Sequence, residues 1–278
     1  MDQNVKVTIG IPIYNAERFL NLAIESVLAQ TFYDFELILT DDGSNDNSLK
    51  IIKSFNDPRI IVIADGENMG ISYRLNEQID LAKGKYFVRM DADDFMFPNR
   101  VLKQYQFLED HSEVDLVGSP VLVIDDENLV IGKRDTFIPQ KIKKAFRHSI
   151  FIHPTVMGKT AWFKKFGYSV PLKGVEDFDL WIRSFNHSEF ALLDIPLLYY
   201  REPLRIKMST YRFRQVQYRR CIWNNRALLN NKFFLFKLIF LSYIKEFIYS
   251  FASFFKIDYQ LLKLRNSKSI VENKGLLT

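Results

Sequence analysis

The chain has 278 residues, and its 47% hydrophobic and 26% charged content excludes a disordered polar chain and allows one large core or two modest ones. The single cysteine, Cys221, excludes an internal disulfide framework and is typical of a reducing compartment. The net charge of +5 is modest, but carboxylates crowd the first two thirds and the last third is basic and aromatic, which predicts an acidic, metal-using N-terminal region and a tail that meets an anionic surface.

Up to about residue 110 the sequence alternates β-rich runs with amphipathic stretches. The β-rich runs predict strands over Val5–Ile9, Phe35–Leu39, Arg59–Ile63 and Lys85–Val88. The amphipathic stretches predict helices over Ala16–Gln30, over a segment with Leu49, Ile52 and Phe55 that Ser44 or Asn45 caps, and over Gly70–Ala82. Alternation of this kind implies right-handed crossovers, so the predicted fold is α/β with a doubly wound, mostly parallel, Rossmann-like sheet.

The alternation weakens beyond residue 110. We expect a strand over Val114–Val123, a short basic helix over Gln140–Arg147, and a helix that opens with Val175–Trp181. Strand residues follow over Leu192–Tyr200, interrupted by Pro196. The composition changes near Arg205, where a helical pattern dense in arginine and aromatic residues covers Ser209–Leu229 and a long apolar run follows over Phe233–Phe255.

Polar side chains gather where the predicted strands end. In a parallel sheet these ends meet at one edge, where ligands bind near a switch in strand order. A random distribution would scatter Asp and Asn over all turns, so we infer one shared ligand site from the residues that follow the strands: Tyr14, Asn15, Asp41, Asp42, Asp65, Asn68, Asp91 and Asp93.

The segment Asp91-Ala92-Asp93-Asp94 directly follows a buried strand. Carboxylates this close raise each other's pKa, and a hard divalent cation such as Mg²⁺ or Mn²⁺, which shares such sites with substrate phosphates, relieves the repulsion. The segment alone is weak evidence, because Asp-rich turns also cap helices. It predicts a metal-diphosphate site when it is taken together with the other strand ends.

The turns after the first two strands suit a nucleotide base. Tyr14, which follows Pro12, offers a ring that stacks on a uracil-type base, and a carboxylate of Asp41-Asp42-Gly43-Ser44 accepts the ring N–H; an Asp-Gly turn alone usually means only a turn. Arg74 follows Asn68-x-Gly70 by one helical turn. It is either a phosphate ligand or a solvated helix residue, and the residues alone leave both open.

These segments, in this order and spacing, resemble the family-2 glycosyltransferases of the GT-A fold, which use nucleotide-diphosphate sugars in bacterial polysaccharide assembly. The resemblance covers about residues 5 to 205 and rests on Ile11–Asn15, Asp41–Ser44, Asn68–Gly70, Asp91–Asp94 and Glu176-Asp177. It implies that Tyr14 and Asp42 contact the base, Asp65 the nucleoside side, Asp91 the ribose or first phosphate, and Asp93 a Mn²⁺ or Mg²⁺ ion. The remaining nucleotide-site residues on this basis are Pro12, Asn15, Asn68, Gly70, Arg74 and Ala92.

Glu176-Asp177 is then the candidate catalytic pair. An inverting transfer needs a carboxylate that takes the proton of the acceptor hydroxyl. The family motif, which includes Leu180-Trp181 here, implies that Asp177 is this base and that Glu176 positions it or binds the acceptor. The structural alternative is that both acids only occupy the first turn of a helix, where the macrodipole favours negative charge.

The expected protein is thus an inverting, metal-dependent glycosyltransferase that uses a UDP-sugar and a glycan or lipid-linked acceptor. One alternative is a sugar nucleotidyltransferase, but Gly10–Tyr14 is not the Gly-rich phosphate loop of that class. Another is an inactive, membrane-bound assembly partner, which is expected to lack the metal or base carboxylates that this chain has. Arg201, Arg205 and Lys207 form either a basic loop over phosphates or a solvated charge run.

The domain prediction is a catalytic domain over residues 1–205, with a nucleotide half over about 1–110 and an acceptor half over 111–205, and a helical extension over 206–278. Charges in Phe233–Phe255 argue against a membrane span. We expect the extension to contact the inner face of the cell membrane, to form a homodimer or to pack on the catalytic domain. No nucleic-acid motif is present, and Met1–Asn4 lack the character of a secretory signal, so we expect a cytoplasmic, peripheral protein without a nucleic-acid partner.

Overall fold

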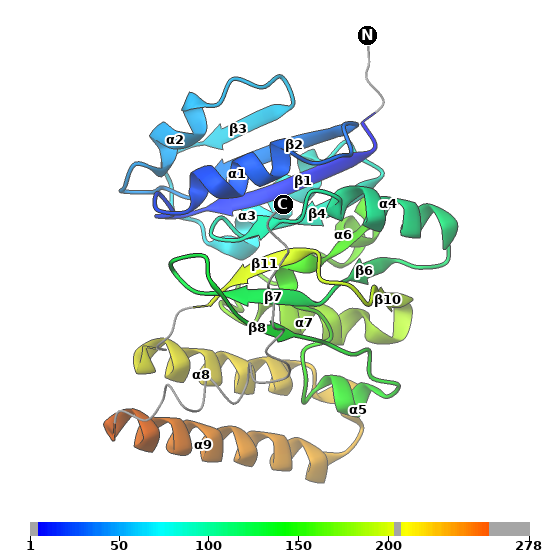
Figure 1. Cartoon of the computed structure of the whole chain (residues 1–278). Coiled ribbons are helices and arrows are strands. Elements are labelled where there is room, and N and C mark those ends of the chain that lie inside the picture. Colours follow the sequence, from blue (N-terminus) through cyan, green and yellow to red (C-terminus); the bar gives the residue numbers. More distant parts are fainter. Residues whose placement is uncertain (1–4, 203–206, 256–278) are drawn as a thin grey trace.

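The computed structural model describes residues 5–202 and 207–255. Its first part alternates strands and helices as predicted (Figure 1). The elements are β1 (Val7–Ile13), α1 (Leu20–Leu28), β2 (Phe35–Asp41), α2 (Ser48–Ser54), β3 (Ile60–Ala64), α3 (Ile71–Leu81) and β4 (Tyr86–Arg89). Strands β1 and β2 run further than the apolar runs suggest, so the polar residues at their ends belong to the sheet edge itself.

The remaining elements complete the larger sheet and build a second, smaller sheet. They are β5 (Phe95–Met96), α4 (Arg100–Asp110), β6 (Leu116–Gly118), β7 (Val121–Ile124), β8 (Val130–Arg134), α5 (Ile142–Ala145), η1 (His153–Thr155), β9 (Met157–Lys159), α6 (Thr160–Phe166), α7 (Glu176–Ser184), η2 (Phe185–His187), β10 (Phe190–Leu192) and β11 (Leu198–Arg201).

The seven-stranded sheet has the order β10-β6-β9-β4-β1-β2-β3, in which β9 alone runs antiparallel to its neighbours. The prediction of a doubly wound, mostly parallel sheet is therefore confirmed. The second sheet has the order β5-β11-β7-β8. Strand β11 pairs with β5, which directly follows the Asp-rich loop after β4, and this pairing brings the second sheet to the edge of the first.

Two predicted strands of the acceptor half are each divided between the two sheets, which corrects the single strand expected over Val114–Val123 and agrees with the interruption expected at Pro196. The Val114–Val123 run supplies β6 to the large sheet and β7 to the small one, and Leu192–Tyr200 likewise supplies β10 and β11. A proline lies at each division, Pro120 and Pro196. Because proline lacks the N–H that a ladder needs, the chain leaves one sheet there and enters the other.

Helices cover both faces of the large sheet, and alternate side chains of one strand enter different cores. In β4, Tyr86 and Val88 join the core under α1 and α4, whereas Phe87 joins the core under α3, α6 and α7. The same alternation separates Leu116 from Val117 in β6. Because successive strand residues point to opposite faces, each of these strands contributes side chains to the cores on both sides of the sheet.

The C-terminal region forms a helical pair, α8 (Met208–Asn224) and α9 (Lys232–Phe254), joined by η3 (Arg226–Leu229). The two helices lie side by side at the end of the molecule opposite α2 and β3 (Figure 1). Ile222, Leu235 and Leu238 pack with Phe146 and Ile182 of the catalytic part. Within the described residues, no helix is both long and apolar enough to cross a membrane.

Candidate active site

A cavity of about 710 Å³ opens at the carboxyl ends of β1, β2 and β4. We call it the donor cavity. All the residues that the sequence predicts for the nucleotide and metal site line it except Asp65 and Arg74: the lining includes Pro12, Tyr14, Asn15, Asp42, Asn68, Gly70, Asp91, Ala92 and Asp93. Convergence of strand ends is the physical reason that such distant positions share one cavity.

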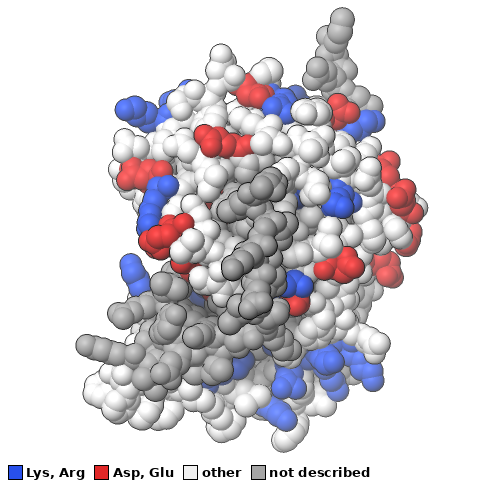
Figure 2. Space-filling model, in the orientation of Figure 1, with Lys and Arg blue, Asp and Glu red and all other residues white. Residues whose placement is uncertain are grey.

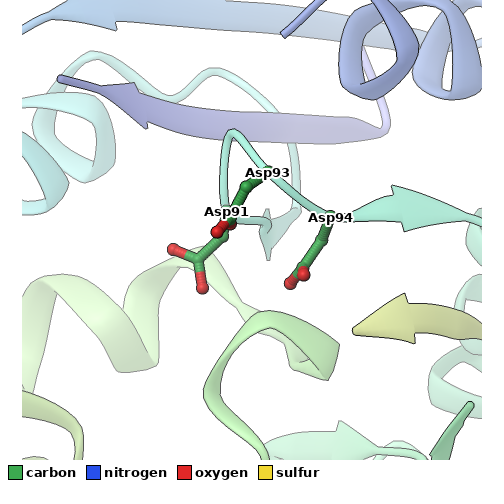
Figure 3. Close-up of side chains that lie close together, drawn as sticks. All are labelled: Asp91, Asp93 and Asp94. Atoms are coloured by element: carbon green, nitrogen blue, oxygen red, sulfur yellow. The ribbon is translucent and has the colours of Figure 1, made fainter. Parts of the chain in front are cut away.

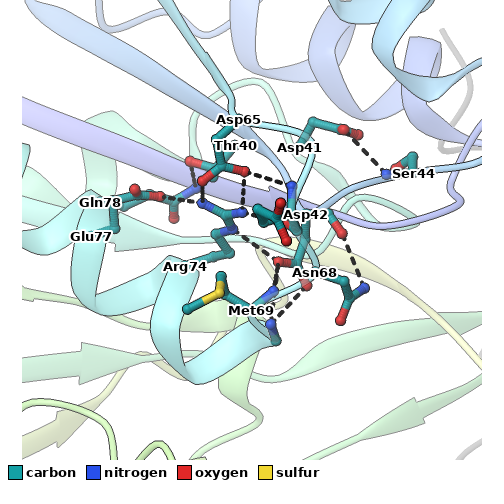
Figure 4. A network of polar contacts seen from close by, with 12 residues as sticks. Thr40, Asp41, Asp42, Ser44, Asp65, Asn68, Met69, Arg74, Glu77 and Gln78 are labelled. Atoms are coloured by element: carbon teal, nitrogen blue, oxygen red, sulfur yellow. Dashed lines mark hydrogen bonds and ion pairs between the residues drawn. The ribbon is translucent and has the colours of Figure 1, made fainter.

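Arg74 lies outside the cavity lining but holds Asp42, which belongs to that lining (Figure 4). Its buried guanidinium donates to Asp42 Oδ1 at 2.9 Å, to both carboxylate oxygens of Asp65, to Glu77 and to the Glu67 carbonyl. These bonds use all five guanidinium N–H donors, so none remains for a phosphate. The structure therefore corrects both expectations for Arg74: it is neither solvated nor a phosphate ligand, but holds two carboxylates.

The ion pair with Arg74 and the backbone N–H of Glu67 lower the pKa of Asp65 to about 2. Asp65 lies outside the lining of the donor cavity, which does not favour direct contact with a nucleoside bound there. Asp42 is the group that faces the ligand side. Its carboxylate also accepts from the backbone N–H groups of Met69 and Gly70, and Gly70 has φ 87, a conformation that glycine adopts without strain.

The loops after β1 and β2 hold each other. Asn15 donates its backbone N–H to Ser44 Oγ at 3.0 Å and accepts the Asn45 N–H on its side chain at 2.8 Å. Ser44 and Asn45 therefore do not cap α2 as predicted; Asp46 accepts the Ser48 N–H there at 2.9 Å. Beside this junction the Tyr14 side chain is 51% exposed, so its ring is free to stack on a planar ligand.

The aspartate loop, Asp91–Asp94 between β4 and β5, presents three carboxylates on one side of the chain (Figure 3). One oxygen each from Asp91, Asp93 and Asp94 can be chosen within 4.8 Å of one another. Desolvation, and then the charge of Asp91, raise the pKa of Asp93 to about 6. Burial raises the pKa of Asp94 well above its usual range.

This donor set fits a hard divalent cation. Three carboxylates whose shared charge is unfavourable without a counterion are the ligands that Mg²⁺ and Mn²⁺ prefer. Asp94 adds a second sign, since its buried Oδ2 accepts no hydrogen bond within the described part of the chain. The sequence predicts the metal at Asp93 alone, and the structure adds Asp91 and Asp94 to the candidate ligands.

Two arginines, Arg89 and Arg201, position the aspartate loop, and the sequence predicts neither of these contacts. Arg89, at the end of β4, is buried and donates to Asp91 Oδ2 at 2.7 Å. Arg201 ends β11, donates its backbone N–H to Asp94 Oδ1 at 2.8 Å and its Nε–H to the Asp93 carbonyl at 2.9 Å. Arg201 belongs neither to a basic loop over phosphates nor to a solvated charge run, because it is a buried strand residue. Arg205 lies outside the described residues, and Lys207 is exposed.

A second cavity, of about 680 Å³, lies next to the donor cavity. Its lining includes Glu176, Asp177 and His153, and it shares only Ile71 and Asp91 with the lining of the donor cavity. We call it the acceptor cavity for its position relative to the predicted catalytic pair. Asp91 thus stands at the boundary between the predicted diphosphate site and the predicted base.

The predicted catalytic pair, Glu176 and Asp177, occupies the first turn of α7. Burial, and secondarily the charge of Asp177, raise the pKa of Glu176 to about 7, and burial also raises the pKa of Asp177. Glu176 Oε2 is buried and has no hydrogen-bond partner among the described residues. A helix start stabilises acids but does not require an unpartnered buried one, so the pair resembles a functional site more than a helix terminus.

We expect Glu176→Gln to stabilise the fold at pH 8 and not at pH 4. A carboxyl whose pKa rises from 4.5 to about 7 on folding costs nothing while it is protonated in both states. Its penalty grows between those pH values and is complete above pH 7, at up to about 3 kcal/mol. Denaturant melts of wild type and variant at both pH values measure the difference. The exposed Glu189→Gln is the control, and an equal change in both variants would contradict the assignment.

Comparison with known proteins gives a consistent picture. The model of glycosyl transferase family 2 matches residues 8–168. A glycosyltransferase of Methanocaldococcus jannaschii is 30% identical in an alignment 281 positions long that covers 97% of each chain. EpsE, a glycosyltransferase of Bacillus subtilis, is 36% identical over 192 residues, 67% of this chain and 69% of that protein. The chondroitin synthase of Pasteurella multocida is 28% identical over 193 residues, 68% of this chain but 20% of the synthase.

Solved structures share the fold. TarS of S. aureus, in complex with UDP-GlcNAc, has a TM-score of 0.59 at 20% identity, over 79% of this chain and 67% of that one. A mannosyltransferase of Pyrobaculum calidifontis, in complex with GDP-Man and Mn²⁺, has a TM-score of 0.59 at 16% identity, over 93% of this chain and 74% of that one. Together with the strand-end motifs and the Asp-rich loop, these matches show that the chain belongs to glycosyl transferase family 2 and has the GT-A fold.

Proposed function

We propose that this glycosyltransferase moves a sugar, with inversion, from a UDP-linked donor to a hydroxyl of a glycan or lipid-linked oligosaccharide in cell-surface polysaccharide synthesis. The observation that carries the proposal is the meeting of the donor and acceptor cavities at Asp91. This meeting supports a transfer in which the aspartate loop lies between the nucleotide of the donor and the Glu176/Asp177 pair. The name of the chondroitin synthase supports a polysaccharide product.

The donor cavity supports the nucleotide part of the proposal. Tyr14 stacks on the uracil ring, and Asp42 Oδ2, which accepts only the Gly70 N–H among the described residues, takes the ring N–H. Asp91, Asp93 and Asp94 would hold a Mn²⁺ or Mg²⁺ ion, which when bound neutralises the departing diphosphate. The nucleotide sugars named for TarS and the mannosyltransferase, and the Mn²⁺ of the latter, support this assignment.

In the transfer, the acceptor oxygen forms a bond to the anomeric carbon while the bond from that carbon to the diphosphate oxygen breaks. Asp177 takes the proton of the attacking hydroxyl, and the electron pair of the broken bond leaves with the diphosphate. The raised pKa of the Glu176/Asp177 pair brings it nearer to neutral pH, where a general base is most effective. Glu176 binds or orients the acceptor hydroxyl beside it.

Calorimetric titration of UDP and of GDP, each with and without Mn²⁺, tests the donor class. We expect tight binding of UDP that depends on Mn²⁺, and weaker binding of GDP. Asp93→Ala should remove the dependence on Mn²⁺, whereas Asp80→Ala, on the exposed face of α3, should not change it. Equal binding of GDP would overturn the role of Asp42, and metal-dependent binding in Asp93→Ala would move the ion elsewhere.

The proposal includes peripheral contact with the inner face of the membrane through α9. Its aromatic residues recur at helical spacing and are widely exposed: Phe233 81%, Phe236 61%, Phe240 64%, Tyr243 56%, Phe247 72%, Phe251 55% and Phe254 80%. Lys232, Lys237 and Lys245 occur on the same helix. Exposed apolar area together with basic residues favours a helix in the headgroup plane of anionic lipid.

Phe236→Ser/Phe240→Ser/Phe247→Ser should abolish co-sedimentation with phosphatidylglycerol vesicles, because it removes three exposed rings without touching the core. Tyr33→Ser/Leu129→Ser, which replaces two exposed apolar residues elsewhere, is the control. Unchanged sedimentation of the triple variant would exclude α9 as the membrane contact. If the same variant then loses a dimer seen by ultracentrifugation, α9 is the interface of a homodimer instead.

A further inference from the structure

A third hollow, of about 580 Å³, lies between α5 and the start of α9. We call it the α5 pocket. Its lining includes Lys141, Lys143, Lys144, Arg147, Phe137 and Phe234. Arg147 also lines the acceptor cavity, so the α5 pocket and the Glu176/Asp177 pair are reached from one continuous surface.

The pocket is strongly cationic. Its three lysines and Arg147 are all exposed, and no Asp or Glu in the described ranges forms an ion pair with any of them. Figure 2 shows Lys and Arg side chains over the lower end of the molecule, where Figure 1 places α5 and α9, and no Asp or Glu among the described residues visible there. Cations that the fold leaves uncompensated in a concave site favour an anionic ligand.

Two of the lysine ammonium groups at the pocket lie over aromatic rings, in cation–π contacts. Lys143 Nζ lies 6.0 Å from the centre of the Phe234 ring, and Lys144 Nζ lies 5.5 Å from that of Phe137. Next to them, burial and then the charges of Arg147, Lys245 and Lys144 lower the pKa of His148. The positive field therefore reaches from the acceptor cavity to the pocket.

We propose that the α5 pocket binds a phosphate group of the acceptor while the acceptor hydroxyl lies beside Glu176 and Asp177. This rests on the proposed function, which it extends by assigning the acceptor a phosphate. Lysine ammonium groups and an arginine fork are the donors that bind phosphate oxygens in proteins.

The pocket also suggests how a lipid-linked acceptor would lie. Phe234 belongs to the first turn of α9 and lines the α5 pocket. The exposed aromatic face of α9 begins at the neighbouring residue, Phe233. A lipid diphosphate would place its phosphates at Lys143 and Lys144 and its chain toward α9. A soluble glycan phosphate would use the same cations without the rings.

Binding is measured with the full chain in EDTA, which removes the ion that the donor cavity is proposed to need for a diphosphate, so that neither the metal site nor transfer takes part. The probes are inorganic pyrophosphate, geranyl diphosphate and phosphatidylglycerol vesicles. We expect both diphosphates to bind wild type, and Lys143→Gln/Lys144→Gln/Arg147→Gln to weaken that binding roughly tenfold or more. Lys50→Gln/Lys53→Gln, on α2 at the opposite end of the molecule, should leave it unchanged.

Tighter binding of geranyl diphosphate than of pyrophosphate supports a lipid-linked source, and equal binding supports a soluble phosphate. Absence of diphosphate binding by wild type, or its persistence in the triple variant, overturns the α5 pocket. Binding of vesicles without binding of either diphosphate also overturns it and leaves only a general membrane surface. Metal-dependent UDP binding, measured separately, reports on the proposed function, so failure of the pocket and failure of the transferase assignment are distinguishable.

Discussion

Asp177→Asn is expected to lower the rate of sugar transfer by about 10²- to 10⁴-fold, the range over which a positioned general base contributes. The amide has nearly the same shape as the carboxylate but cannot take the proton of the acceptor hydroxyl. The donor cavity does not include Asp177 in its lining, so metal-dependent UDP binding should remain within about twofold of wild type. Turnover is followed with the UDP-sugar that a donor panel identifies, and donor binding by calorimetry.

The control for this variant is Asp80→Asn, which removes one carboxylate from the exposed face of α3. It should change neither rate nor binding. Turnover of Asp177→Asn close to that of wild type would remove Asp177 from the role of base. A full loss in Glu176→Gln instead would assign that role to its neighbour, whose pKa is raised to about 7.

Arg74→Met should lower the free energy of unfolding by about 3 to 5 kcal/mol, the cost of breaking a buried ion pair by removing one partner. The variant leaves the Asp42 carboxylate, 7% exposed in its side chain, with backbone N–H donors but no counterion. Domains of this kind are stable by only about 5 to 15 kcal/mol, so the loss is a large share of the total. Urea melts measure it.

Arg59→Met is a matched control, because it also removes an arginine from an ion pair, with Asp57, but both side chains are about one-fifth exposed. Partly exposed pairs contribute about 0 to 1 kcal/mol. Arg74→Lys should fall between the two variants, since an ammonium group keeps the charge but replaces five N–H donors with three. Equal melts for Arg74→Met and Arg59→Met would contradict the structural role of Arg74.

The fold of the nucleotide half could be predicted because its strands and helices are long enough to carry a pattern. Strands β1 and β2 are mostly apolar and are buried over nearly their whole length, as expected for strands covered on both faces, and α1 and α3 show the spacing of helices with one buried side. Much of the acceptor half could not be predicted. Strands β5 and β9 have 2 and 3 residues, too few to show any period, and only their pairing with distant strands defines them.

The candidate site divides in the same way. Residues at the ends of parallel strands, such as Asp42 and Asp93, could be grouped from the sequence because topology brings those ends together. The partners that hold them could not. Arg74 shows no sign in the sequence that distinguishes a buried residue holding two carboxylates from a surface helix residue, and Arg201 lies 107 residues along the chain from the Asp94 carboxylate that it contacts.

The bonds from Arg201 to the aspartate loop also determine when, during synthesis, the donor site is completed. Strands β1 to β4 and the loop leave the ribosome first, but β11 follows only after the whole acceptor half has been made. Until then Asp94 lacks its backbone donor and the Asp93 carbonyl lacks the guanidinium, so of the two arginines that position the loop only Arg89 is in place. Residues 1–110 on their own therefore lack the two Arg201 bonds that position the aspartate loop, and the loop has its full set of contacts only after the acceptor half has been made.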